Sequence, residues 1–199
     1  MGSDQLVLSF DTSAEHCAAA LLCNGQIICS KSVKMQNRQA ECLGPMVESL
    51  LNEKKFSKNQ VTRIGVGIGP GNFTGIRISV SFARGLSLAL GCPAIGINTF
   101  DATYYGKSDP ALVVIQSTGG KVYVQRYPDA LETPWYGVEA DVSFACDSRL
   151  EPPYAKYLTE NIAHLAAEKR KDHLEPPAPF YIKPPNAVLS RKNIPKILT

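Results

Sequence analysis

A glycine-rich turn between a strand-like run and a helix-like run constrains this chain most strongly. The run from Thr62 to Ile68 has strand character, and it ends in the turn Gly69-Pro70-Gly71-Asn72-Phe73. A helix is predicted from Thr74 to about Leu90, followed by a strand from Pro93 to Ile97. A strand, a crossover helix and a second strand form a unit whose two strands lie parallel, so this part of the chain predicts an α/β sheet.

Three more strands are predicted before this unit. Gln5 to Phe10 reads as a strand, and Asn24-Gly25 lies between two further apolar runs. Asn-Gly is a strong hairpin signal because both residues tolerate the positive φ of a type I′ turn. A helix is predicted from Arg38 to Glu53, with Pro45 bending it or marking its start. A three-stranded meander followed by alternating helices and strands predicts a mixed sheet with helices on it, as in the RNase H-like core.

The second half of the chain has fainter patterns. The segments Ala111 to Gln116 and Lys121 to Tyr127 predict a second hairpin, and Tyr154 to Lys171 predicts a helix. We therefore expect two lobes, an N-terminal RNase H-like lobe over residues 1–104 and a smaller, degenerate C-terminal lobe over residues 105–199. The C-terminal segment is expected to return to the first lobe.

Composition narrows the class of protein. The chain has 199 residues, of which 44% are hydrophobic and 20% charged, enough for a buried core. No apolar run approaches the roughly 18 residues of a membrane span, and the N-terminus lacks a signal-peptide layout, so we expect a cytoplasmic protein without a membrane partner. The six cysteines include no CxxC pair, which is typical of reduced thiols. The net charge of +3 is too small to require a polyanionic partner.

Two segments are candidates for nucleotide contact, and each has a structural alternative. A glycine turn before a helix can present N–H groups to an anion, although the spacing matches neither a P-loop nor GxGxxG. The alternative is a tight turn whose helix is capped by Thr74. An Asp at the end of a first strand is where actin-like ATPases place the carboxylate that meets the metal and phosphates, but it can also cap its own turn. The candidate contacts are Asp11, Thr12, Ser13, Gly71 and Thr74.

Catalytic and metal signatures are absent from the sequence. His16, His164 and His173 are far apart, and no HxxxH or HExxH spacing occurs. The chain also has no GxSxG motif, so a serine hydrolase has no support. We predict neither a metal site nor catalytic residues.

The predicted helix from Thr74 carries apolar residues around more than half of its circumference, so it needs two coverings. Ser79, Ala83 and Ser87 form a row of small side chains at i+4 spacing that admits a second helix at close range. That helix belongs either to a partner protein or to this chain. If it belongs to a partner, Ala83→Arg should block binding and leave the chain folded.

Several blocks of sequence resemble one family in order and spacing. They are Leu8-Ser9-Phe10-Asp11-Thr12-Ser13, GPGNFTGIRI at residues 69–78, PAIGINT at 93–99, Gly120-Lys121-Val122-Tyr123, and PFYIKPPNA at 179–187. Together they resemble the TsaB (YeaZ) family, strongly over residues 5–127 and again near residue 179.

The chain departs from this family's pattern in three ways. Asn72 replaces the usual Ser, and Gln39 stands where the family often has His. The region between Asp129 and Pro179 is shorter than usual.

The resemblance implies an actin-like (ASKHA) fold of two lobes, the second reduced. Family members resemble the catalytic subunit TsaD without its metal-binding histidines, and they pair with TsaD through a helical bundle. With the ATPase TsaE, they support transfer of a threonylcarbamoyl group to the adenosine beside the anticodon of tRNA. The resemblance therefore implies a non-catalytic accessory subunit that binds TsaD and recruits TsaE.

The same resemblance implies a homodimer when the chain is alone, and contact with tRNA only through the complex. No cofactor is expected on this chain, whereas ATP and metal are expected on the partner subunits. The interface is expected to use the predicted helices that start near Arg38 and at Thr74. The candidate interface residues are Leu43, Met46, Val47, Leu50, Ile76, Arg77, Val80, Ala83 and Ser87.

Other functions stay open. The chain is alternatively a small actin-like ATP-dependent enzyme that uses Asp11 and the glycine turn, or a peptidase, as the family's older glycoprotease label suggests. A further alternative is direct tRNA binding through the basic C-terminal segment, which otherwise is a solvated terminus. Its cations are Lys183, Arg191, Lys192 and Lys196.

Overall fold

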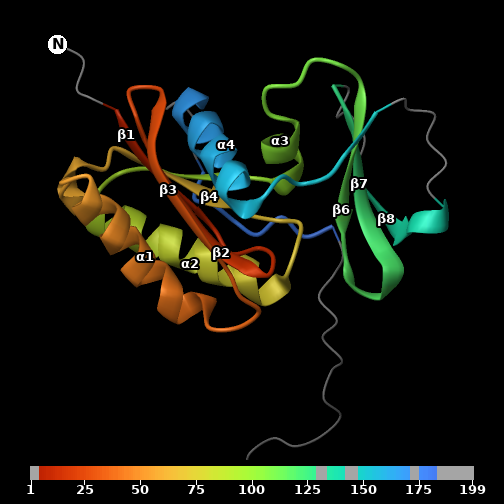
Figure 1. Ribbon diagram of the computed structural model, residues 1–199, viewed down its shortest axis with the longest axis horizontal. Helices are drawn as coiled ribbons and strands as arrows, with labels where there is room; N and C mark the ends of the chain where they lie inside the picture. Colours follow the sequence, from red (N-terminus) through yellow and green to blue (C-terminus); the bar gives the residue numbers. More distant parts are fainter. Residues whose placement is uncertain (1–4, 129–133, 142–147, 171–174, 183–199) are drawn as a thin grey trace, which may run out of the picture.

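Two β-sheets lie side by side in the computed structural model, which describes residues 5–128, 134–141, 148–170 and 175–182 (Figure 1). The first sheet has five strands in the order β3-β2-β1-β4-β5. Their bounds are β1 Leu6–Asp11, β2 His16–Cys23, β3 Gln26–Lys34, β4 Arg63–Gly67 and β5 Ala94–Ile97.

The pairing of these strands follows from the local sequence signals. β1, β2 and β3 form the predicted antiparallel meander, and Asn24 and Gly25 have φ angles of 51° and 81° between β2 and β3. β4 pairs parallel with both β1 and β5. This mixed order confirms the predicted RNase H-like core.

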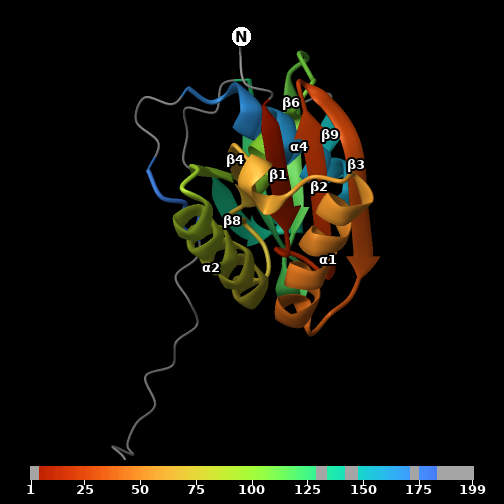
Figure 2. The same ribbon diagram turned by 90° about the vertical axis from the view of Figure 1, so that its left-hand side faces the viewer.

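Helices cover both faces of the first sheet (Figure 2). α1 (Gln39–Glu53) and α2 (Phe73–Leu90) pack on one face against side chains of β1 such as Leu8 and Phe10. α3 (Thr99–Tyr104) and α4 (Ala155–Glu168) pack on the other face, where they bury Val7. Because successive side chains of a strand alternate between faces, β1 is buried along its whole length.

Two helical details differ from the sequence predictions. α1 begins at Gln39, so Pro45 lies inside the helix and does not mark its start. α3 was not predicted, because six residues are too few for a helical periodicity to show. Its start is fixed by Asn98, whose side-chain oxygen accepts a hydrogen bond from the Asp101 N–H at 2.8 Å.

The second sheet has four strands in the order β8-β7-β6-β9. Their bounds are β6 Ala111–Gln116, β7 Lys121–Tyr127, β8 Trp135–Val138 and β9 Arg149–Leu150. β6 and β7 pair antiparallel, which confirms the second predicted hairpin. The side chains of Val113, Ile115 and Tyr123 form a cluster with Phe100 of α3, which joins this sheet to the first lobe.

α4 crosses back from the second sheet to the first. The Ser9 hydroxyl donates to the Thr159 carbonyl at 2.8 Å, and a side chain at Gly65 would lie 2.9 Å from the Ala166 Cβ. The Arg63 guanidinium donates to carbonyls at the C-terminal end of α4. A boundary between residues 1–104 and 105–199 therefore separates α4 from the sheet that it covers.

Residues 175–182 pass between the two sheets, where Figure 1 shows them in blue. The Phe180 N–H donates to the Ile68 carbonyl at 2.8 Å, directly after β4. The basic residues from Lys183 onward, and Cys146, lie outside the described residues. No helix in the described part of the chain is both long and apolar enough to cross a membrane.

Candidate functional site

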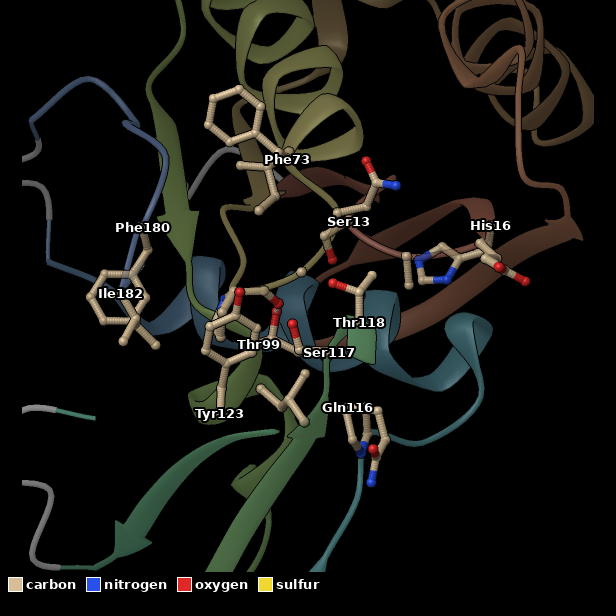
Figure 3. Close-up of a pocket in the computed structure, with 18 of the residues that line it drawn as sticks. Ser13, His16, Phe73, Thr99, Gln116, Ser117, Thr118, Tyr123, Phe180 and Ile182 are labelled. Atoms are coloured by element: carbon tan, nitrogen blue, oxygen red, sulfur yellow. Dashed lines mark hydrogen bonds between the residues drawn. The ribbon is translucent and has the colours of Figure 1, made fainter. Parts of the chain in front are cut away.

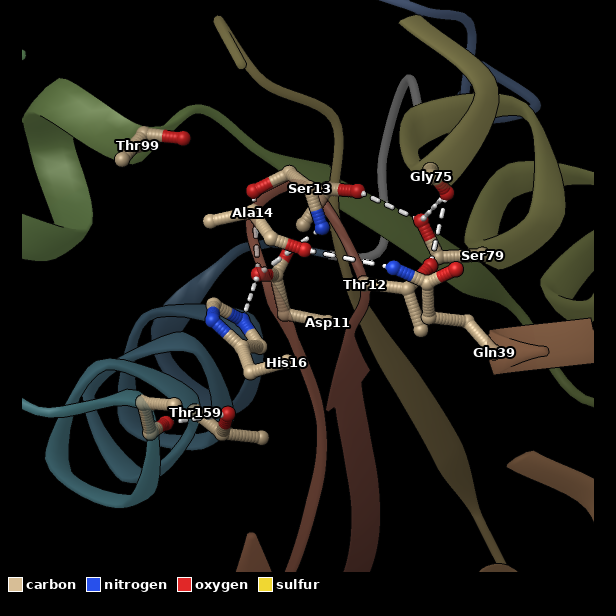
Figure 4. A network of polar contacts seen from close by, with 12 residues as sticks. Asp11, Thr12, Ser13, Ala14, His16, Gln39, Gly75, Ser79, Thr99 and Thr159 are labelled. Carbon is tan, nitrogen blue, oxygen red and sulfur yellow. Dashed lines mark hydrogen bonds and ion pairs between the residues drawn. The ribbon is translucent and has the colours of Figure 1, made fainter. Parts of the chain in front are cut away.

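The loop after β1 holds a buried carboxylate. Asp11 is only 1% exposed, and its Oδ2 accepts hydrogen bonds from the Ser13 hydroxyl at 2.9 Å and the Ser13 N–H at 3.2 Å. His16 Nε2 lies 2.6 Å from the same oxygen (Figure 4). An ionised carboxylate only accepts hydrogen bonds, so a hydrogen bond between these two atoms requires the proton on Nε2. Asp11 Oδ1 has no hydrogen-bond partner among the residues that the structure describes.

The glycine-rich turn packs directly on this loop. A side chain at Gly71 would lie 2.2 Å from the Ser13 carbonyl oxygen, and one at Gly75 would lie 1.8 Å from the Thr12 carbonyl oxygen. The Thr12 hydroxyl donates to the Gly75 carbonyl at 2.6 Å, and the Asn72 N–H donates to the Ser13 carbonyl. Glycine is needed at both positions because two backbone segments approach within contact distance.

The first turn of α2 is capped by Asn72. Its side-chain oxygen accepts a hydrogen bond from the Gly75 N–H at 3.0 Å. The prediction that Thr74 caps this helix is therefore wrong, and Thr74 instead lies exposed within the first turn. α2 begins at Phe73, so Asn72 occupies the N-cap position, where Asn is preferred over Thr.

A cleft of about 1090 Å³ lies in front of this loop and turn, between the two lobes (Figure 3). Three of the candidate nucleotide contacts, Ser13, Gly71 and Thr74, line it. Asp11 and Thr12 lie buried behind its wall. Nucleotide contact at this cleft stays a prediction.

The far wall of the cleft comes from segments that the sequence predicted as strands or as a returning C-terminal segment, but not as parts of a site. Gln116, Ser117, Thr118 and Tyr123 contribute from the second sheet, as Figure 3 shows. The C-terminal residues 180–182 form another part of the lining. A local sequence pattern does not predict which distant segments meet in space. The sequence therefore indicated a site only at the turns of residues 11–16 and 69–75.

Most of the predicted interface residues face the chain's own core. Seven of them are buried: Leu43, Met46, Val47, Leu50, Ile76, Val80 and Ala83. The other two are Arg77, which contacts Phe73 and Tyr181, and Ser87, whose hydroxyl donates to the Cys92 carbonyl at 2.6 Å.

The predicted interface at these nine residues stays a prediction. α1 and the sheet of the same chain supply the two coverings of α2. Ala83 is fully buried there, so Ala83→Arg would disrupt the protein's own core and not a partner contact alone.

The exposed side of α1 and α2 carries apolar side chains that are outside the predicted interface set. A groove of about 370 Å³ between α1 and α2 is lined by Pro45, Leu51, Phe82, Leu86 and Leu90, among others. Glu48 and Lys58 form an ion pair of 3.1 Å at this groove. On the outer face of α2, Leu88 is 87% exposed.

Metal ligands are not gathered in the part of the chain that the structure describes. No three His, Cys, Asp or Glu side chains lie close enough there to hold a metal ion. His16 is paired with Asp11, and the ring of His164 stacks on Tyr105 with 5.5 Å between centroids.

Comparison with known proteins identifies the family. The family model of TsaD, the tRNA N6-adenosine threonylcarbamoyltransferase, matches residues 33–179. The tRNA threonylcarbamoyladenosine biosynthesis protein TsaB of Buchnera aphidicola subsp. Schizaphis graminum is 30% identical over 141 residues, covering 68% of this chain and 67% of that protein.

The chain belongs to the TsaB (YeaZ) family. TsaB of Escherichia coli K12 is 29% identical over 140 residues, covering 68% of this chain and 60% of that protein. A solved Pseudomonas aeruginosa protein, described by its similarity to the peptidase YeaZ, matches with a TM-score of 0.74 at 22% identity. That match covers 90% of this chain and all of the other, and with the sheet order it confirms the actin-like fold.

Proposed function

We propose that this TsaB-family chain is a non-catalytic accessory subunit that pairs with a TsaD-type catalytic subunit. With a TsaE-type ATPase, which it recruits, it supports threonylcarbamoylation of the adenosine beside the anticodon of tRNA in the cytoplasm. The curated relatives are named for tRNA threonylcarbamoyladenosine biosynthesis, and the TsaD family model matches most of the chain. These likenesses support a paralogue that works beside TsaD.

One observation carries the non-catalytic part of the proposal. Asp11 stands where an actin-like enzyme uses a carboxylate, yet its Oδ2 is bonded to Ser13 and His16 of its own loop. The carbonyl groups of Ser13 and Thr12 occupy the space that side chains at positions 71 and 75 would need. A loop packed in this way acts as a structural contact. The proposal therefore assigns ATP and metal to the partner subunits and gives this chain no cofactor.

The proposed partner surface is the outward side of α2 and its groove with α1. Ser81, Gly85 and Ala89 follow one another at i+4 spacing on the exposed face of α2. Small side chains in such a row allow a partner helix to approach closely. Leu88 lies beside them, and burial of a leucine side chain contributes roughly 1.5–3 kcal/mol. This surface is the candidate site for a TsaD-type subunit, or for a second copy when the chain is alone.

The matched variants for this surface are Leu88→Arg and Val138→Arg. Both residues are exposed hydrophobics, at 87% and 45%, but Val138 lies in β8 of the second sheet. We expect Leu88→Arg to weaken binding to the TsaD-type subunit at least about tenfold, the equivalent of about 1.4 kcal/mol. Val138→Arg should bind like the natural chain. Equal binding by both variants contradicts this assignment of the surface.

The cleft between the lobes favours one alternative function. Its size and the presence of Ser13 and Thr74 in its lining suit a small actin-like ATP-dependent enzyme. That alternative requires ATP hydrolysis by the isolated chain, lost in Asp11→Asn. A peptidase requires hydrolysis of a peptide bond under the same conditions. tRNA binding by the isolated chain would contradict the proposal that tRNA is met only through the complex.

A further inference from the structure

The two sheets are joined by short covalent connections within the described residues. Residues 105–110 lead from α3 to β6, and residues 151–154 lead from β9 to α4. Beside the first of these connections, Phe100 packs on the second sheet and Tyr104 stacks on Tyr127 with 4.4 Å between ring centroids. The lobes can hinge on this side of the cleft. The segment 175–182 adds a third crossing between the lobes, and its contacts divide between the two sides.

One backbone hydrogen bond and one close approach place this segment against β4 and β5. The Phe180 N–H donates to the Ile68 carbonyl, immediately after β4. A side chain at Gly96 in β5 would lie 3.4 Å from Cβ of Pro177. The segment therefore runs across the same edge of the first sheet as the glycine-rich turn.

Side chains of the segment alternate between the lobes. Phe180 and Ile182, both labelled in Figure 3, pack on the cluster that contains Val113, Ile115 and Tyr123 of the second sheet. Tyr181, between them, points to the first lobe and stacks on Phe73 with 4.9 Å between ring centroids. Successive side chains of an extended chain point in opposite directions, so one short segment contacts both lobes.

The first-lobe end of this contact is a small surface cluster on α2. The Arg77 Nε–H donates to the Tyr181 hydroxyl at 3.0 Å, and its guanidinium carbon lies 3.7 Å from the centroid of the Phe73 ring. The three side chains thus hold one another through a stack, a hydrogen bond and a cation–π contact. Tyr181 is 39% exposed, so this cluster is open to solvent on one side.

We propose that residues 175–182 are an interlobe clasp, latched by the contact of Tyr181 with Phe73 and Arg77, which sets the width of the cleft. Release of the latch frees Tyr181 from the first lobe while Phe180 and Ile182 remain on the second. The lobes then separate on the side of the clasp and hinge about the two connections and the contacts of α3 with the second sheet. A surface cluster opens more readily than a buried strand ladder, so the latch opens while both sheets stay folded. This inference is independent of the proposed function.

Hydrogen–deuterium exchange of the full chain tests the latch. Tyr181→Ala should raise the exchange rate of the Phe180 amide about tenfold or more and leave the β1 amides unchanged. Tyr181→Phe, which keeps the ring stack and loses the hydroxyl, should give a smaller increase. The control is Tyr154→Ala, since Tyr154 is 84% exposed and outside the segment. An unchanged Phe180 rate in Tyr181→Ala overturns the proposal, as does an equal increase in all amides.

Energy transfer measures the movement of the lobes. Trp135 is the one tryptophan of the chain and lies in β8, and exposed Ser81 on α2 is a site for an encoded fluorescent acceptor. Tyr181→Ala should reduce transfer from Trp135 to the acceptor, and Tyr154→Ala should leave it unchanged. If transfer stays constant while the Phe180 amide exchanges faster, the segment does not hold the lobes together and the proposal fails.

Discussion

Asp11 Oδ2 and His16 Nε2 lie 2.6 Å apart at the start of the β1–β2 hairpin. The carboxylate is almost fully buried, and the imidazole covers it on the side of the cleft. A buried carboxylate is tolerated only where donors replace its water, and Ser13 and His16 supply them here. The pair therefore stabilises the loop on which the glycine-rich turn packs.

Removal of the imidazole should destabilise this loop. His16→Ala leaves Oδ2 with donors from Ser13 alone, so we expect a loss of roughly 1–3 kcal/mol in the free energy of unfolding. Urea denaturation followed by circular dichroism measures it. Glu15→Ala is the control because Glu15 is an exposed neighbour in the same loop. Equal stability of the two variants would show that the Asp11–His16 contact contributes nothing.

Alanine should change the stability of the protein in opposite directions at two glycines of α2. Gly75→Ala places Cβ against the Thr12 carbonyl, which is a severe packing defect. It should lower the free energy of unfolding by about 3 kcal/mol or more. Gly85→Ala meets no atom within 4 Å and should stabilise α2 by roughly 0.5–1 kcal/mol. Thermal unfolding of both variants checks the pair. Similar melting temperatures would contradict the close approach at Gly75.

Arg63 should stabilise the C-terminal end of α4 more than it stabilises its own strand, β4. Its Nη1 donates to the carbonyls of Ala166 at 2.9 Å and Lys169 at 2.6 Å, which the helix itself leaves free. Arg63→Met keeps the apolar stem and removes the donors, so we expect a loss of about 1–3 kcal/mol and faster amide exchange in the last turn of α4. Arg84→Met, at an exposed position of α2, is the matched control. Unchanged exchange in α4 would exclude this capping role.

Alkaline pH should destabilise the fold. Burial raises the pKa of the Cys17 thiol from 9.0 to about 12, with further contributions from Cys42 and Asp11. The folded state therefore disfavours the Cys17 thiolate. The contribution of the neutral thiol to the free energy of unfolding is complete below pH 9 and is lost as pH rises from about 9 towards 12. Burial and a hydrogen bond to Asp101 raise the pKa of Tyr127 in the same direction.

Urea unfolding under reducing conditions between pH 8 and 11 measures this alkaline loss, and Cys17→Ala should flatten the profile. A profile of the natural chain that is flat or rises over this range would contradict the predicted direction.

Local signals predicted most of the first sheet. Asn24-Gly25 indicated the β2–β3 hairpin, and the glycines at 69–75 indicated the turn between β4 and α2. Both signals depend on backbone conformation, which a few residues determine. The position of α4 was not predictable in this way, because its contact with Gly65 joins segments about a hundred residues apart.

The site was predicted less completely for a related reason. The apolar width of α2 was read correctly, but the pattern does not distinguish a partner's helix from the chain's own α1. Ala83 is fully buried in one core cluster with side chains of α1, so the chain's own α1 covers that face. The cleft needed residues from the second sheet and from the C-terminal segment, and these carry no motif that indicates a shared wall.

Light scattering coupled to size-exclusion chromatography shows whether this chain is a non-catalytic partner of a TsaD-type subunit. The chain is measured alone and with the TsaD-type subunit of the same organism, and each fraction is assayed for ATPase activity. We expect a discrete complex of the two chains and no ATP hydrolysis by this chain alone. Absence of a complex, together with ATP turnover by the isolated chain that Asp11→Asn abolishes, would contradict this expectation.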